Sequence, residues 1–184
     1  MSAARRRVLV RLVKAGALLI FGGLVVVLLG SIWPTVTTQR VSIYVDAAAL
    51  VPGEAIRTAI GNLPVLVVRR GDAELGSLDD SRVNDAASWL SREPDGVDAV
   101  HRGVDPRFLV IEALGTALQC ELELLPPSED EFQGIPWAGG FADKCRGERY
   151  DWAGRAYRNQ TAKRNLRVLP HTVDADDGLT VSLP

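Results

Sequence analysis

The feature that most constrains this 184-residue chain is a stretch without any charged side chain, residues 15–33. Its sequence is AGALLIFGGLVVVLLGSIW. A helix of this length, rising about 1.5 Å per residue, matches a hydrocarbon core about 30 Å thick. A core helix of a soluble domain would be shorter and would show a polar face. We therefore predict a single transmembrane helix. A cleaved signal peptide is the alternative, although no clean small-x-small cleavage motif precedes the polar segment that follows.

Basic residues are distributed unevenly around this stretch. Only Arg40 follows it closely, whereas the cations that precede it are Arg5, Arg6, Arg7, Arg11 and Lys14. Because positively charged flanks stay in the cytoplasm, the N-terminus is predicted to be cytoplasmic and the remainder periplasmic, in a bacterial-type inner membrane. The run RRVL at residues 6–9 is similar to a twin-arginine export signal, but the same arginines would also simply set the topology.

The chain divides into three predicted parts. Residues 1–33 form the cytoplasmic N-terminus and the transmembrane anchor, residues 34–40 a tether, and residues 41–184 an outer head. The head is predicted to be mainly β, a small antiparallel sandwich or barrel, because its short apolar runs are separated by Pro, Gly and Asp turns. The predicted strands are residues 41–45, 63–68, 108–114, 119–124, 166–169 and 179–183, with one short helix around 80–90.

Charge and residue counts exclude several functions. After Arg40 there are 15 basic and 23 acidic residues, and an acidic head is a poor partner for nucleic acid. Two cysteines and two histidines leave little material for a metal site. His101 and His171 are isolated and interpreted as structural, and the acidic run 128–131 as solvated. No phosphate-binding glycine loop and no G-x-S-x-G motif occurs, so the sequence assigns no catalytic residue.

Two segments of the head match short motifs. In residues 147–160, the pattern C-P-C-H-G-S-x-Y/F-D-x-x-G-R is matched by Gly147, Tyr150, Asp151, Gly154 and Arg155. Upstream, the pattern C-T-H-L-G-C is matched by Thr116, Leu118 and Cys120. These patterns are the cluster-binding boxes of Rieske iron–sulfur proteins, and the chain resembles the Rieske subunit of cytochrome bc complexes over nearly its whole length. The resemblance implies a β-sheet head on a single anchor and, in the family, a 2Fe–2S cluster held by two cysteines and two histidines.

The ligand positions of both boxes depart from the family. They are occupied by Gly115, Ala117, Asp143 and Arg146. Glycine and alanine lack a donor atom, arginine stays protonated, and one carboxylate cannot hold two irons. The serine that bonds to the cluster in the family is replaced by Glu148, and the proline loop by residues 160–163. The sequence therefore predicts a degenerate iron–sulfur site and no cofactor.

The two cysteines fall at the family positions that are not ligands. In bc-type subunits these positions form a disulfide between the cluster loops, so the resemblance implies a disulfide between Cys120 and Cys145. An oxidising periplasm would favour it. One alternative is that both cysteines bind a metal together with His101 and His171, although no compact zinc spacing supports this. Another is a thiol redox switch, although nothing local marks either cysteine as activated.

The segment 144–167 is strongly basic. It holds eight Lys and Arg residues against only Glu148 and Asp151. We predict a docking patch for an acidic partner or for lipid headgroups, formed by Lys144, Arg149, Lys163 and Arg164. The alternative is ordinary surface charge that is compensated by acidic residues elsewhere in the head.

These features together predict a cluster-free, membrane-anchored Rieske-like protein. Its expected role is that of a structural or accessory subunit of a cytochrome bc-type quinol:cytochrome c reductase or of a respiratory supercomplex, with cytochrome b and c subunits as partners. A periplasmic assembly or regulatory factor is the second hypothesis. An electron-transfer subunit with unorthodox ligation, such as Asp143 with His171, is the third.

Overall fold

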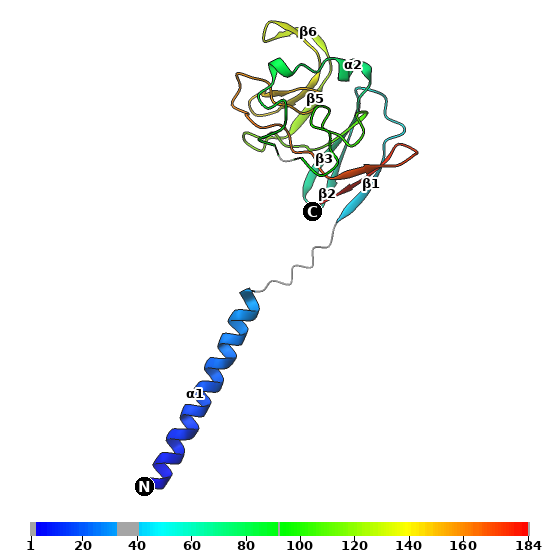
Figure 1. The fold of residues 1–184 in the computed structure, drawn as a ribbon. Helices are drawn as coiled ribbons and strands as arrows, with labels where there is room; N and C mark the ends of the chain where they lie inside the picture. Colours follow the sequence, from blue (N-terminus) through cyan, green and yellow to red (C-terminus); the bar gives the residue numbers. More distant parts are fainter. Residues whose placement is uncertain (1–2, 33–40, 92, 184) are drawn as a thin grey trace. The chain divides into compact units, whose positions relative to one another are not determined.

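The computed structural model describes residues 3–32, 41–91 and 93–183. The chain falls into two compact units, Met1–Gln39 and Arg40–Pro184, which can be followed by colour in Figure 1. The predicted tether, residues 34–40, and the last residue of the predicted anchor, Trp33, lie outside the described residues.

The first unit contains helix α1, Ala3–Ile32, which is 30 residues long. At 1.5 Å per residue the helix measures about 45 Å, longer than a hydrocarbon core. It begins ahead of the predicted apolar stretch, so Arg5 and Lys14 belong to the same helix as Leu19 and Ile20. Apolar side chains are exposed along its length. Among the described residues, α1 is the one helix long and apolar enough to cross a membrane.

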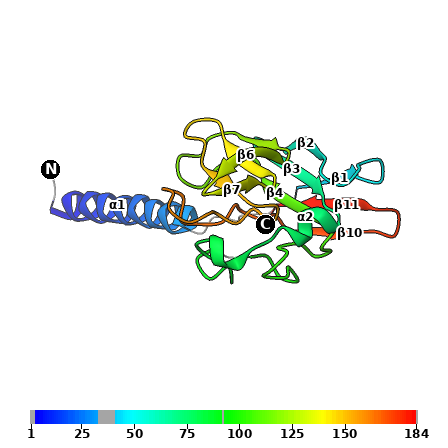
Figure 2. The ribbon, with the colours of Figure 1, turned by 90° about the horizontal axis from the view of Figure 1, so that it is seen from above.

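The second unit, the head, is built from short antiparallel sheets, as the sequence predicted (Figure 2). One sheet has the order β1 (Ser42–Asp46), β11 (Gly178–Ser182), β10 (His171–Val173). A second has the order β2 (Ala55–Ile60), β3 (Leu63–Arg69), β4 (Phe108–Glu112). A third has the order β5 (Leu122–Leu125), β8 (Gly140–Asp143), β9 (Arg149–Tyr150), and β6 (Ser128–Phe132) pairs with β7 (Ile135–Trp137) as a hairpin.

Strands β3 and β4 lie between two hydrophobic cores. Successive side chains of a strand point to opposite faces, and here both faces are covered. One core cluster takes Leu66, Val68, Leu109 and Ile111, together with Phe141 and Trp152. The other takes Val65, Val67, Phe108 and Val110, together with Leu179 and Val181. Burial on both faces explains why these two strands read as continuous apolar runs rather than as alternating patterns.

The irregular region after β3 differs from the prediction. The helix expected around 80–90 is reduced to the short 3₁₀ helix η1 (Asp80–Arg82), and a short helix α2 (Asp72–Gly76) precedes it. Beyond η1, the Asp85 carboxylate accepts the backbone N–H groups of Trp89, Leu90 and Ser91, which closes a turn instead of a helix.

Two predicted strands are shorter than expected. β5 begins only at Leu122, because Gln119 has a φ of 57° that does not fit a strand. In the predicted strand 166–169, Val168 forms only an isolated bridge with Ile111. Both segments border the loops that contain the two sequence boxes; these loops are called the tip of the head.

Three arginines are buried in the head, and two of them bind backbone carbonyls. Arg70 donates from Nη1 to His101 and Trp152 and from Nη2 to Phe108, at 2.6, 3.1 and 2.9 Å. Burial lowers the pKa of Arg70 to about 10, so the side chain stays charged at neutral pH. Arg102 and Arg155 are likewise fully buried. Arg102 also donates to carbonyls, whereas Arg155 pairs with the carboxylates of Asp151 and Asp80. Arg70 and Arg102 therefore satisfy carbonyl groups that the irregular segments leave without strand partners.

His171 on β10 makes the stability of the head dependent on pH. Its Nδ1 lies 2.8 Å from the Leu169 carbonyl oxygen, and its Nε2 accepts the Val104 N–H at 3.4 Å, so the fold selects the neutral ring. Burial lowers the pKa of His171 below its usual value. Its contribution is therefore fully present above the unfolded pKa of about 6.5 and is lost as the pH falls below it.

We expect the free energy of unfolding to fall more between pH 7.5 and pH 5.5 in the native chain than in His171→Gln. Glutamine replaces the ring by a side chain that does not titrate, so the carboxylates that titrate in both chains cancel in the difference. Chemical denaturation at the two pH values measures it. Equal slopes in the two chains would contradict this role of His171.

Candidate functional site

The disulfide predicted from the family resemblance is present at the tip of the head. Cys120 and Cys145 are joined, with 5.9 Å between their Cα atoms. Cys120 ends the loop that follows β4, and Cys145 lies in the loop between β8 and β9. The backbone adds a second link beside the disulfide, because the Lys144 N–H donates to the Glu121 carbonyl at 3.0 Å. The two sequence boxes therefore form one bridged pair of loops.

The leading positions of the two boxes face each other directly. A Cβ atom added to Gly115 would lie 3.1 Å from the Cβ of Asp143 and 3.5 Å from the hydroxyl of Tyr150. Asp143 is buried, and its Oδ1 accepts the N–H groups of Cys145 and Arg146 at 3.0 and 2.7 Å. Its carboxylate thus closes the second loop on itself.

Tyr150 of β9 forms a further contact with the loop that contains the first box. Its hydroxyl oxygen accepts the Thr116 N–H at 3.1 Å and lies 3.2 Å from Thr116 Oγ1. Thr116 Oγ1 in turn donates to the carbonyl of Arg164 at 2.8 Å. Burial raises the pKa of Tyr150, so the phenol stays protonated at neutral pH. The tyrosine that the family resemblance places beside a cluster is here bonded to the protein backbone.

Glu148 ties the second box to the segment that replaces the proline loop. The side chain is buried and accepts the N–H groups of Thr161 and Ala162 at 3.2 and 2.5 Å. Arg146 lies at its outer side, with Nε 3.9 Å from Glu148 Oε1 and half of its side chain exposed. Sequence reasoning noted Glu148 as a departure from the family but did not find this bracing role.

The donor atoms at the tip do not fit an iron–sulfur cluster. Within the described residues, the group at this position that could hold a metal is Cys120, Asp143 and Cys145, whose ligand atoms lie within 4.8 Å of one another. Both sulfurs are in the disulfide, so they offer no thiolate, and a single carboxylate remains. A 2Fe–2S cluster takes four protein ligands. Gly115 and Ala117 supply none.

Neither histidine belongs to this group. His101 Nδ1 lies 2.6 Å from Asp98 Oδ2 in the irregular region after β3, and His171 is bonded to Leu169 on β10. Among the described residues, the structure therefore gives no support to a metal site that joins His101 and His171 with the two cysteines, or to ligation by Asp143 with His171.

The four residues of the predicted docking patch make different contacts. Lys144 is paired with Glu121 at 3.0 Å, and the guanidinium of Arg149 stacks 4.5 Å from the ring centre of Trp137. Lys163 Nζ donates to the Gln160 carbonyl at 2.5 Å. Arg164 is exposed, and within the part of the head that the structure describes it has no acidic partner within 4.0 Å. Of the four, Lys144 is the one with an acidic partner in the described head, whereas Arg149 and Lys163 contact a ring and a backbone carbonyl.

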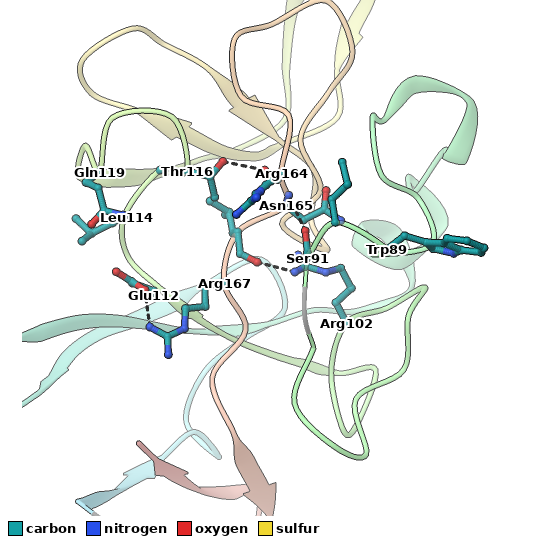
Figure 3. A pocket seen from close by; sticks show the side chains of 13 residues that line it. Trp89, Ser91, Arg102, Glu112, Leu114, Thr116, Gln119, Arg164, Asn165 and Arg167 are labelled. Carbon is teal, nitrogen blue, oxygen red and sulfur yellow. Dashed lines mark hydrogen bonds and ion pairs between the residues drawn. The ribbon is translucent and has the colours of Figure 1, made fainter. Parts of the chain in front are cut away.

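Arg164 lines a groove of about 760 Å³ beside the first box (Figure 3). Its other walls come from the loop 89–91, from the end of β4 and from the segment 164–167. Sequence reasoning missed most of the groove, including Trp89, Glu112 and Arg167. The one local signal for the groove in the sequence is Trp89, a tryptophan within an otherwise polar stretch.

Comparisons with known proteins found one curated relative and several solved structures that are similar to this chain. The chain is 31% identical over 177 residues to the ubiquinol–cytochrome c reductase iron–sulfur subunit of Allochromatium vinosum, an alignment that covers 94% of this chain and 85% of that protein. A solved structure described as a hyperthermophilic respiratory Complex III contains a chain that is 15% identical, with a TM-score of 0.44, and the match covers 91% of this chain and 97% of that one. No family profile matches the sequence.

Proposed function

Because the chain belongs to the family of Rieske iron–sulfur subunits of ubiquinol–cytochrome c reductase, we propose that it is a cluster-free accessory subunit of a cytochrome bc-type complex or of a supercomplex that contains one. Its function is binding. The anchor packs against transmembrane helices, and the head braces the outer surface of the complex.

One observation carries this proposal: the first ligand positions of the two boxes, Gly115 and Asp143, lie close together. A Cβ atom on Gly115 would lie 3.1 Å from the Cβ of Asp143, tighter than an ordinary side-chain contact, and the Asp143 carboxylate is bonded to backbone N–H groups. Tyr150 and Glu148 are likewise bonded within the protein. The tip is therefore closed by its own hydrogen bonds and has no donor set for two irons. A head of this kind supplies a surface and not an electron-transfer site.

The proposed placement follows from the charges around α1. Basic residues at its start keep the N-terminus in the cytoplasm, so the head lies in the periplasm of a bacterial-type inner membrane. Residues 1–33 then form the cytoplasmic start and the anchor, residues 34–40 the tether, and residues 41–184 the head. The partners proposed from this placement are the cytochrome b and c subunits of the complex.

The purified full-length chain is expected to contain less than a tenth of an iron atom per chain and to give no electron paramagnetic resonance signal after reduction with dithionite. The matched control is the Allochromatium vinosum subunit expressed and purified in the same way, in which a 2Fe–2S cluster corresponds to about two irons per chain. A stoichiometric, reducible cluster in this chain would overturn the cluster-free assignment at once.

The accessory role has its own test. A tagged chain purified from its native membrane in mild detergent should bring down haem proteins in a fixed ratio, together with a second Rieske subunit that keeps all four ligands. Haem absorbance and subunit composition give the readout. A haem-free eluate with a varied set of proteins would contradict the accessory role and support the assembly or regulatory factor.

A further inference from the structure

The head holds a tryptophan out in solvent beside the groove. Trp89 is 87% exposed and its neighbour Leu90 is 57% exposed, and no large apolar side chain among the described residues is more exposed than Trp89. Burying an apolar side chain of this size would stabilise the fold, so its exposure is a cost. Trp is among the residue types most enriched at the centres of protein interfaces.

The turn that presents Trp89 is rigidly held. The buried Asp85 carboxylate accepts the N–H groups of Trp89, Leu90 and Ser91 at 2.7, 2.9 and 3.2 Å. Asn165, far along the chain, donates from its side-chain amide to the Asp85 carbonyl at 2.8 Å. These contacts hold the backbone at Trp89, so the exposed ring is carried on a well-supported turn.

Backbone strain within the same turn supports this interpretation. Ser88, directly before Trp89, has a φ of 54°, in the left-handed region that L-residues other than Asn and Asp rarely adopt. Such a conformation persists where surrounding contacts impose it, and it is typical of binding sites. Ser88 Oγ lies 3.3 Å from the Asn165 amide nitrogen that also holds Asp85. The strained residue, Ser88, therefore lies directly before the exposed Trp89.

The adjacent groove carries excess positive charge. Figure 3 shows Arg164 beside Thr116, and the pair of Arg167 and Glu112 further along the wall. Arg167 meets Glu112 in a single contact of 3.5 Å, and Arg164 meets no acidic side chain within 4.0 Å in the described head. Arg102 also lines the groove, but its donors are taken by Glu93 and backbone carbonyls. The groove therefore suits an anionic occupant.

We propose that Trp89, Leu90 and the groove between Arg164 and Arg167 form a docking surface for an acidic segment of a partner protein. An apolar side chain of that segment packs on Trp89, and its carboxylates pair with Arg164 and Arg167. The Gln119 side chain on the wall suits a peptide backbone, and a concave opening suits a chain segment better than the face of a bilayer. That the partner is a subunit of a cytochrome bc-type complex rests on the proposed function.

The test uses the full-length chain in its native membrane. Trp89 is replaced by the photo-crosslinking residue p-benzoylphenylalanine, the membranes are irradiated, and the cross-linked peptide is mapped by mass spectrometry. Tyr44, which is 62% exposed on β1 and outside the groove, receives the same replacement as the matched control. We expect position 89, and not position 44, to cross-link to one protein within a segment that combines several acidic residues with an apolar one.

Charge reversal tests the electrostatic part of the surface. In the chain with the cross-linker at position 89, Arg164→Glu should lower the cross-link yield at least tenfold. Lys163→Glu changes the neighbouring exposed cation, which does not line the groove, and should leave the yield within twofold. An unchanged midpoint of thermal unfolding in both variants shows that the head is intact. A cross-link yield that does not change in Arg164→Glu would overturn the assigned role of the arginines.

The identity of the cross-linked species separates this inference from the proposed function. An acidic segment of a haem-complex subunit supports both, and an acidic segment of another protein supports the surface but overturns the host complex. Co-purification of haem subunits without any cross-link at position 89 overturns the surface alone. Cross-links only to lipid, or only to the acidic β6 strand of a second copy of this chain, also overturn it.

Discussion

Replacing Arg102 by alanine should lower the free energy of unfolding of the head by about 3–5 kcal/mol, the range for breaking a buried ion pair. The side chain is fully buried and donates to the carbonyls of Ala153, Gly154 and Leu166 at 2.8, 3.0 and 2.5 Å. It also pairs with Glu93 at 2.8 Å. Alanine would leave those acceptors and a mostly buried carboxylate without a donor, and each unmet group costs about 1–3 kcal/mol.

Two further variants make this result interpretable. Arg102→Lys keeps the charge but lacks the planar fork that reaches several carbonyls at once, so it should recover only part of the loss. Arg164→Ala removes an exposed arginine and should change the free energy of unfolding by less than about 0.5 kcal/mol. Guanidinium denaturation followed by tryptophan fluorescence measures all three. A loss below about 1 kcal/mol for Arg102→Ala would mean that water replaces the guanidinium.

Removing the disulfide should lower the stability of the head by about 3 kcal/mol in the chain-entropy model. Cys120 and Cys145 are 25 residues apart, so the bond closes a loop of moderate length in the unfolded chain. The double variant Cys120→Ser with Cys145→Ser should still fold, because the Lys144 N–H and the Tyr150 hydroxyl also hold the two loops together. Denaturation curves recorded without reductant measure the difference.

A reductant supplies the matched control for the disulfide. The native chain denatured in the presence of a phosphine reductant should lose the same free energy as the double variant, and the double variant itself should not respond. A double variant that fails to fold, while the reduced native chain keeps its near-ultraviolet circular dichroism, would point to the serines rather than to the missing bond. Equal stability with and without the bond would contradict the entropic account.

The parts of the fold that were predicted from the sequence depend on local patterns. The apolar run that forms most of α1 and the runs of β3 and β4 are continuous in the sequence, so they can be recognised without knowledge of distant contacts. The region 80–90 was predicted to be helical and is not, because Asp85 bonds to the backbone after it and because Asn165, 80 residues later, holds the turn. Contacts over that distance leave no local sequence pattern.

The candidate site was likewise predicted from the sequence only in part. The resemblance placed the boxes and the disulfide correctly because motif spacing is a local property. It did not reveal that Glu148 and Asp143 would close the tip through hydrogen bonds to the backbone, nor that Arg149 would stack on Trp137. The exposure of Trp89 was equally hidden, since a tryptophan in a sequence is expected to be mostly buried until its neighbours are known.

The β6–β7 hairpin has a particular place in the covalent structure of the head. Its strands, Ser128–Phe132 and Ile135–Trp137, lie between Cys120 and Cys145 in the sequence, and the first of them is largely exposed. A single peptide-bond cleavage in its turn would open the ring without releasing a fragment, because the disulfide still joins the two pieces. The head can therefore be nicked at this hairpin and remain one molecule until a reductant reaches the tip.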